Sequence, residues 1–240
     1  MLHAMSLAML LAMLLAMSLG ACGGSDSKPG ATAQVPDEST TVAASVPTTR
    51  VRVLMIGTSL TAGLGLDPDS SYPAILQRLA DSAALRVEIV NAGLSGETSA
   101  GAAQRVEWLL GTKADVVVIE TGANDGLRGL NPDTTRAKLV SIIEQVRAHN
   151  PEVRILLAQM EAPPNLGPRY VRAFHDNFLN VARDQGVTLI PFFLDGIAGV
   201  RAMNQPDGIH PNEEGARLAA RNMWRTLSPV LRQVPGAVVR

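Results

Sequence analysis

The sequence predicts an α/β fold, a three-layer α/β/α sandwich built around a five-stranded parallel sheet. Five short apolar runs recur at intervals of 29 to 38 residues, and the segments between them have helical periodicity. The runs are apolar at nearly every position, which is typical of strands in a sheet that helices cover on both faces. The five runs are 51–56, 86–91, 115–121, 153–159 and 187–190.

The segments between the runs carry start and stop signals for helices. Asn131 followed by Pro132 is typical of a helix start, and Gly186 is typical of a helix end. Right-handed crossovers between the strands distribute such helices over both faces of the sheet. The predicted helices are 71–84, 98–110, 132–149, 168–185 and 212–231.

Composition excludes several classes of function. The formal net charge is −1 and aromatic residues make up 3% of the chain, so we expect no nucleic-acid partner. The single cysteine, Cys22, excludes an intrachain disulfide. The four histidines are scattered along the chain without the spacing of metal ligands, and we expect neither a metal nor a cofactor.

The N-terminus is predicted to be a targeting segment. Residues 4–19 are almost entirely Ala, Leu and Met, a length typical of a signal peptide and short for a transmembrane helix. The stretch from Leu19 to Cys22 resembles a bacterial lipoprotein box, although no Lys or Arg precedes the apolar run. The resemblance implies that residues 1–21 are removed and that Cys22 is acylated. The alternatives are a cleaved signal with an incidental cysteine and an uncleaved anchor.

The predicted organisation is therefore a lipoprotein signal peptide (1–21), a disordered tether (22–49) and a folded domain (50–235). The tether is rich in Gly, Ser, Thr, Ala and Pro and has no periodicity. We expect an exported lipoprotein of the bacterial cell envelope, anchored at Cys22 on the periplasmic or extracellular face of a membrane.

Residues capable of chemistry follow the apolar runs. In parallel sheets, sites form where strands end, and Ser59, Gly96 and Asn124 follow the first three runs. Asp207 and His210 lie three residues apart after the fifth run, so the aspartate can fix the histidine tautomer. Each residue alone is compatible with an ordinary turn or helix cap. Together they supply a serine nucleophile, a base, an orienting acid and two oxyanion donors. His149 and His175 are interpreted as structural.

The motifs resemble the four blocks of the SGNH (or GDSL) hydrolase superfamily, over residues 51–231. The blocks are Gly57-Thr58-Ser59-Leu60, Gly96, Gly122-Ala123-Asn124-Asp125 and Asp207-Gly208-Ile209-His210-Pro211. Within the superfamily, residues 124–129, 163–167 and 191–193 resemble the bacterial arylesterase, acyl-CoA thioesterase I and lysophospholipase L1 group.

The resemblance implies roles for individual residues. Ser59 is the expected nucleophile, His210 the general base and then acid, and Asp207 its orienting partner. The expected oxyanion hole consists of the Ser59 and Gly96 backbone N–H groups and the Asn124 side chain, with the loop at 126–131 covering the acyl site. The family usually has Asp where Thr58 stands, and the lost charge is expected to alter local pKa values more than to abolish the chemistry.

The expected function is that of a serine esterase, hydrolysing carboxylic esters or thioesters through an acyl-enzyme intermediate. The expected partners are a small acyl ester or thioester, lysophospholipid among them, and the membrane, and the chain is expected to be a monomer. Two alternatives stay open, a carbohydrate O-acetylesterase and a non-catalytic surface-anchored binding module.

Overall fold

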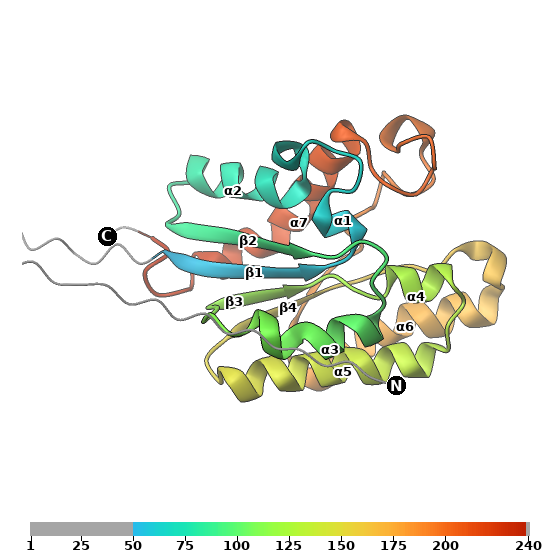
Figure 1. Ribbon diagram of the computed structural model, residues 1–240, viewed down its shortest axis with the longest axis horizontal. Coiled ribbons are helices and arrows are strands. Elements are labelled where there is room, and N and C mark those ends of the chain that lie inside the picture. The colour runs from blue at the N-terminus through green and yellow to red at the C-terminus, as the bar shows by residue number, and fades with distance from the viewer. Residues whose placement is uncertain (1–49, 239–240) are drawn as a thin grey trace, which may run out of the picture. The chain divides into compact units, whose positions relative to one another are not determined.

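A computed structural model describes residues 50–238, in which five parallel strands form one sheet in the order β2-β1-β3-β4-β5 (Figure 1). β1 pairs with β2 on one side and with β3 on the other, so the strand order switches direction at β1. The predicted fold class and the positions of all five predicted strands are confirmed. The strands are β1 (Val51–Gly57), β2 (Val87–Gly93), β3 (Val116–Ile119), β4 (Arg154–Ala158) and β5 (Thr188–Ile190).

Helices cover both faces of this sheet. α2 and α7 pack together on one face, while α3, α5 and α6 form a layer on the other (Figure 1). These five helices confirm the predicted ones, with bounds that differ by at most two residues. They are α2 (Tyr72–Ser82), α3 (Ser99–Leu109), α5 (Pro132–His149), α6 (Pro168–Gln185) and α7 (Glu213–Leu231).

Two short helices were not predicted, α1 (Ser59–Ala62) and α4 (Ala123–Leu127). Segments of four and five residues are too short to display a helical period. Each begins directly after a strand-end turn, and Gly122 before α4 has a φ of +101°, which favours glycine. Three short 3₁₀ helices complete the described chain, η1 (Pro68–Ser70), η2 (Pro164–Leu166) and η3 (Arg201–Met203).

Polar side chains fix where the long helices begin. Ser71, Thr98, Asn131 and Asn212 each accept a hydrogen bond from a backbone N–H in the first turn of the following helix. At the other end of α6, Gly186 adopts the left-handed conformation and closes the last turn. The N-terminal caps fix where the loops at the carboxyl edge of the sheet end and the helices begin. The cap at Gly186 fixes where α6 ends before the chain enters β5 at the amino edge.

The core lies on both faces of the sheet. Every residue of β3 is fully buried, as expected for an inner strand of a covered parallel sheet. On the α6 side, Phe174 and Phe178 are fully buried with ring centroids 5.4 Å apart. Phe178 also packs so closely against Gly122 that a Cβ there would lie 3.1 Å from its ring. The aromatic pair therefore supports the turn that ends β3.

The chain enters the sheet at the edge opposite the carboxyl ends of the strands, since Val51 is the first residue of β1. The expected signal peptide (1–21) and tether (22–49) lie outside the described residues. At the other terminus, Val238 forms an antiparallel bridge with Leu85, past the expected domain boundary at 235. Between residues 50 and 238, no helix has both the length and the hydropathy needed to cross a membrane.

Phe178→Ala is expected to destabilise the protein by about 3–5 kcal/mol, because it leaves a cavity in a fully packed region. Leu179→Ala is the matched control, since the neighbouring side chain is 38% exposed and should cost much less. Urea unfolding of the two variants measures the difference. Equal losses would contradict the packing described here.

Candidate active site

Ser59 stands at the turn between β1 and α1. β1 ends at Gly57, and a Cβ at that position would overlap the Thr61 side chain and lie 2.7 Å from a Glu120 oxygen. β2 comes equally close, because a Cβ on Gly93 would overlap the Ala62 backbone. Glycine at these two positions lets the turn lie directly against its neighbours. The Ser59 residue is 8% exposed, so only its outer side can meet a substrate.

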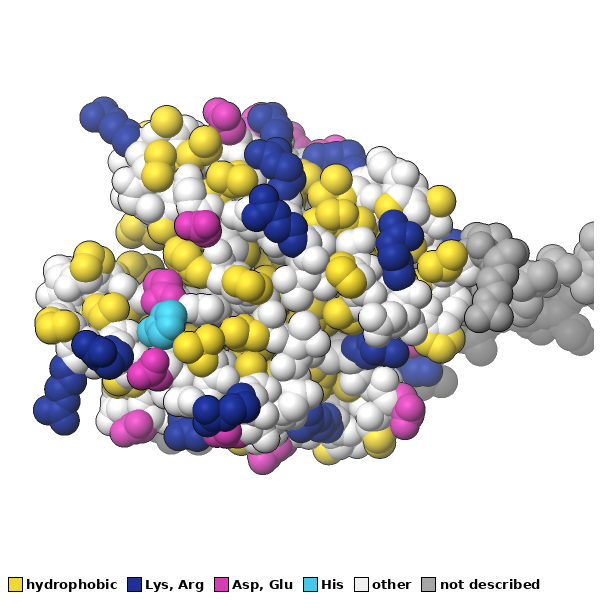
Figure 2. Space-filling model, turned by 180° about the vertical axis from the view of Figure 1, so that it is seen from behind, with side chains coloured by type: hydrophobic (Ala, Val, Ile, Leu, Met, Phe, Trp, Pro, Cys, Tyr) yellow, Lys and Arg dark blue, Asp and Glu magenta, His cyan; other side chains and the backbone are white. Residues whose placement is uncertain are grey.

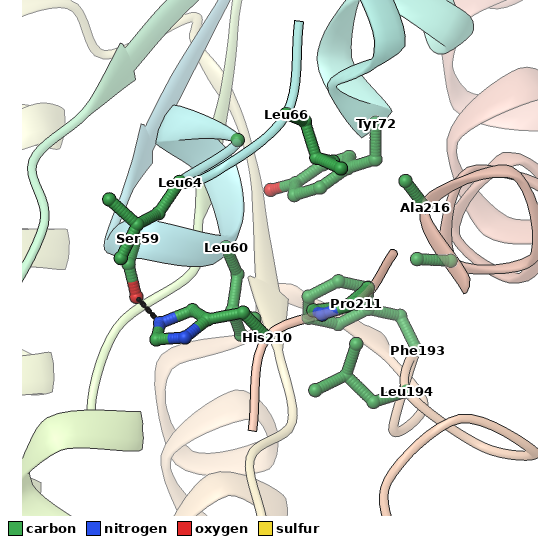
Figure 3. A pocket seen from close by; sticks show the side chains of 12 residues that line it. Ser59, Leu60, Leu64, Leu66, Tyr72, Phe193, Leu194, His210, Pro211 and Ala216 are labelled. Atoms are coloured by element: carbon green, nitrogen blue, oxygen red, sulfur yellow. Dashed lines mark hydrogen bonds between the residues drawn. The ribbon is translucent and has the colours of Figure 1, made fainter. Parts of the chain in front are cut away.

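His210 and Asp207 reach Ser59 from the loop before α7. The Ser59 Oγ lies 2.9 Å from His210 Nε2 (Figure 3). His210 Nδ1 lies 2.6 Å from Asp207 Oδ2. When Nδ1 carries the proton and donates to the aspartate, Nε2 is left as an acceptor for the serine hydroxyl. The structure thus brings together three side chains from opposite ends of the domain in the order that acyl transfer requires.

The Asp207 carboxylate is held by more than the histidine ring. The hydrogen bond from the His210 side chain, with further ones from the backbone N–H groups of His210 and Ile209, lowers the pKa of Asp207 to about 2. The carboxylate is therefore ionised at every pH at which an esterase works. Gln205 secures the same loop, because its amide donates to the Pro211 carbonyl and its backbone N–H to the His210 carbonyl.

Gly96 and Asn124 lie on the other side of Ser59. Gly96 has a φ of +79°, and neither its N–H nor that of Ser59 donates to a group between residues 50 and 238. The Asn124 side-chain amide donates to the Glu97 carbonyl over 2.9 Å, which ties the β2 turn to the β3 turn and leaves its second N–H for another acceptor. The three predicted donor groups thus come from turns after adjacent strands.

Two arginines hold the turn that carries Gly96. Arg105 binds both carboxylate oxygens of Glu97 and also donates to the Ala92 carbonyl at the end of β2. Arg128, in the loop after α4, donates to the Gly96 carbonyl over 2.9 Å. Neither arginine was singled out from the sequence, since each has among its acceptors a backbone carbonyl that only the fold brings near.

A small apolar pocket of about 10 Å³, enough for roughly one water molecule, lies beside the Ser59–His210 pair (Figure 3). Its walls come from α1, α2, α7 and the loop after β5, and include Leu60, Leu66, Tyr72, Phe193 and Leu194. Seen from behind, the molecule is hollowed at the end where the carboxyl ends of the strands lie, and hydrophobic side chains lie on both sides of the hollow (Figure 2). Exposed leucine and isoleucine side chains also occupy the strand-end loops, namely Leu64, Leu94, Leu127, Leu130 and Ile209.

Sequence reasoning missed a buried carboxylate beneath Ser59. Glu120 follows β3, is fully buried, and accepts hydrogen bonds from the Thr58 hydroxyl and the Thr61 hydroxyl. Burial raises the pKa of Glu120 from 4.5 to about 7, although the hydrogen bonds from both threonines act in the opposite direction. The signal was present in the sequence, because Glu120 directly follows the four apolar residues 116–119 within the run 115–121. Only the fold shows what it faces.

The other two histidines of residues 50–238, His149 and His175, take no part in this arrangement. His175 Nδ1 lies 2.7 Å from Glu161 Oε1 and 3.1 Å from the Gln159 amide, at the junction of α6 with the loop after β4. His149 lies in the last turn of α5. Among residues 50–238, no group of three or more His, Cys, Asp or Glu side chains is placed to hold a metal ion.

Residues 55–218 match the GDSL-like Lipase/Acylhydrolase family. Esterase TesA of Pseudomonas aeruginosa is 43% identical over 181 residues, which cover 75% of this chain and 89% of the relative. Thioesterase 1/protease 1/lysophospholipase L1 of Escherichia coli K12 is 36% identical over 75% of this chain and 84% of the relative. The arylesterase of Vibrio mimicus is 33% identical over 68% of this chain and 81% of its own length.

Solved structures agree with these relatives. The crystal structure of TesA superposes with a TM-score of 0.71 at 40% identity, covering 75% of this chain and 99% of the other. A psychrotrophic esterase EstA from Pseudoalteromonas sp., inhibited by monoethylphosphonate, gives a TM-score of 0.72 at 32% identity, covering 76% of this chain and all of the other. The resemblance drawn from the four sequence blocks is confirmed.

The raised pKa of Glu120 makes stability depend on pH. Native Glu120 keeps its proton up to about pH 7, whereas an unfolded glutamate releases it near pH 4.5. The native state therefore binds more protons within this window, and the free energy of unfolding falls as pH rises through it. We expect the wild type to lose about 3 kcal/mol relative to Glu120→Gln between pH 4.5 and pH 8.

Urea unfolding at the two pH values checks this expectation. Glu88→Gln is the control, because Glu88 is an exposed carboxylate on β2 and its removal should leave the wild-type pH dependence intact. The same pH dependence in wild type and Glu120→Gln would show that Glu120 does not titrate in this window.

Proposed function

Because the chain belongs to the GDSL-like lipase/acylhydrolase family and is an ester-hydrolysing enzyme, we propose that Ser59, His210 and Asp207 form its catalytic triad. The observation that carries the proposal is the 2.9 Å contact between Ser59 Oγ and His210 Nε2, with Asp207 2.6 Å from the opposite ring nitrogen. A turn serine without a role would not require this alignment of a base and an acid from a distant loop.

The reaction follows from this geometry. Ser59 Oγ attacks the carbonyl carbon of the ester as its proton passes to His210 Nε2, and Asp207 stabilises the imidazolium that forms. The imidazolium then protonates the departing alcohol or thiol, which leaves an acyl group on Ser59. Water, deprotonated by His210, attacks the acyl-enzyme and restores the free serine.

The Ser59 and Gly96 N–H groups and the Asn124 amide are proposed to bind the oxyanion of both tetrahedral intermediates. Two features support this assignment. The two backbone N–H groups have no acceptor within residues 50–238, and the contact with the Glu97 carbonyl fixes the orientation of the Asn124 amide. A single donor of this kind contributes about 3 kcal/mol to lowering the barrier.

We propose small acyl esters and thioesters as the substrates, with lysophospholipids among them. The relatives are named esterase, thioesterase, lysophospholipase and arylesterase. The exposed apolar side chains of the strand-end loops suit an acyl chain better than a sugar ring. All proposed catalytic groups come from one chain, which supports a monomeric enzyme.

The proposed location is the cell envelope, with the enzyme anchored through acylated Cys22. This proposal rests on the small residues before Cys22 and on the composition of residues 22–49. Since β1 begins at the sheet edge opposite the triad, an anchored enzyme joins its tether at the end of the domain remote from the active site.

The anchor is tested by expressing the full chain and Cys22→Ser in bacteria supplied with radiolabelled palmitate. We expect label and membrane association for the wild type and neither for Cys22→Ser, because the thiol is the site of acylation. Ser27→Ala is the control within the same segment. Membrane-associated, labelled Cys22→Ser protein would refute the anchor at this residue.

Ser59→Ala is expected to reduce hydrolysis of p-nitrophenyl esters by at least about 10³-fold, because no acyl-enzyme can form. The measurement is steady-state hydrolysis by residues 50–240, together with covalent labelling by a fluorophosphonate. A panel of C2 to C12 acyl esters and thioesters, run in parallel, measures acyl-chain preference, and activity confined to acetyl esters would favour an O-acetylesterase.

Ser95→Ala is the matched control, since Ser95 lies in the neighbouring strand-end loop without a place in the triad. Its activity should remain close to that of the wild type. If Ser59→Ala retains wild-type rates, the assignment of the nucleophile is wrong. Absence of both turnover and labelling in the folded wild type would favour the binding-module alternative.

A further inference from the structure

The Glu120 carboxylate lies beneath the turn that presents Ser59, and donors surround it. Thr58 donates from its backbone N–H over 2.9 Å and from its hydroxyl over 3.0 and 3.1 Å to the two oxygens. The Thr61 hydroxyl donates over 2.7 Å. Both threonines and Glu120 are fully buried. One carboxylate therefore binds the residues on either side of the Ser59–Leu60 segment.

This arrangement changes what Thr58 does at the start of α1. A threonine at an N-cap ordinarily accepts a hydrogen bond from the first turn of its helix, but the Thr58 hydroxyl makes no such bond. Its hydroxyl and its N–H both point to Glu120 instead. The Ser59 N–H is the next donor along the chain, and it is left without an acceptor in residues 50–238. A proposed oxyanion donor is thereby kept free.

The backbone of Glu120 reinforces the same contact. Its N–H donates to the Ile56 carbonyl over 2.7 Å, next to the register position at which Ile56 pairs with Ile119. The end of β3 thus holds the end of β1 through both a main-chain and a side-chain connection. Gly57, between Ile56 and Thr58, has no side chain that would keep the end of β1 away from Glu120.

A tyrosine extends this connection to the pocket wall. The Tyr72 hydroxyl lies 2.5 Å from the Thr61 hydroxyl, and Tyr72 lines the apolar pocket beside His210 (Figure 3). Since the Thr61 hydroxyl donates to Glu120, it accepts from Tyr72. The hydrogen bonds run from the pocket through Tyr72 and Thr61 to Glu120, and from there to Thr58 and the nucleophile turn.

We propose that Glu120 is a positioning residue for the reaction, which fixes the Thr58–Thr61 turn so that both the hydroxyl and the N–H of Ser59 face the substrate. The inference rests on the proposed function, because it assigns Glu120 a role through Ser59. A carboxylate suits this task better than its amide, since all groups that face it are donors and an NH₂ group would meet them with its own hydrogens. Displacing catalytic atoms by about 1 Å costs on the order of 100-fold in rate.

Glu120→Gln is the first test, since it preserves size and removes one acceptor oxygen. Thr58→Val, which removes the hydroxyl but keeps the N–H, is the second, and Thr58→Ser is its conservative rescue. We expect Glu120→Gln and Thr58→Val to lower kcat by about 10-fold or more with KM within about twofold, because substrate binding does not use these groups. Thr58→Ser should return kcat to within about threefold of the wild type.

Asn177→Ala separates positioning from stability. Asn177 is buried on α6 and donates to the Pro132 carbonyl, so its loss should lower the melting temperature without changing kcat. All variants are assayed with a p-nitrophenyl ester at a temperature at which circular dichroism shows them folded. If Glu120→Gln does not fold, the Thr58 pair decides the question.

Two outcomes would overturn the positioning role. One is a wild-type kcat in folded Glu120→Gln or Thr58→Val, and the other is an equal loss of kcat in Asn177→Ala. Ser59→Ala distinguishes this failure from failure of the proposed function. An active Ser59→Ala enzyme would refute both the proposed function and the positioning role. An inactive Ser59→Ala enzyme together with a fully active Glu120→Gln enzyme would refute the positioning role alone.

Discussion

The parallel pairing of β1 with both β2 and β3 is the constraint on which the site depends. Because the three strands run in one direction and end at one edge, the turns after them meet there without any long connection. Ser59, Gly96 and Asn124 each occupy one of these turns. Asp207 and His210, the other proposed catalytic residues, come from the far end of the sequence, on a loop that Gln205 and the cap of α7 hold in place. The sheet thus orders one half of the site and a helix start orders the other.

Most of this architecture could be predicted from the sequence, because burial leaves a strong local signal. All five strands were visible as apolar runs and all five long helices as periodic segments with caps. The residues of the proposed triad could be singled out as well, since they follow strands and Asp207 and His210 are only three positions apart. Such features depend on near neighbours in the chain or on the general geometry of parallel sheets.

The features that could not be predicted depend on the register in which neighbouring strands pair. Glu120 meets Thr58 and Thr61 only because Ile119 pairs with Ile56, and nothing local in either segment specifies that alignment. The same holds for Arg105 and Arg128, whose acceptors include the backbone carbonyls of Ala92 and Gly96. The short helices α1 and α4 were not predicted for a related reason. They are set by the tight turns that precede them, and they have no apolar stripe that the sequence could show.

The buried carboxylate also explains how a threonine can stand beside the nucleophile. Burying Glu120 lowers the free energy of unfolding by about 3 kcal/mol at neutral pH. One oxyanion donor lowers the reaction barrier by about the same amount. A second carboxyl at position 58 would lie about 3 Å from the first, and the pair could not both ionise. Thr58 supplies two donors and no charge, so Glu120 can ionise without sharing a proton. The carboxyl group missing at position 58 therefore has a counterpart one strand away, which holds the turn of Ser59 through its hydrogen bonds with Thr58 and Thr61.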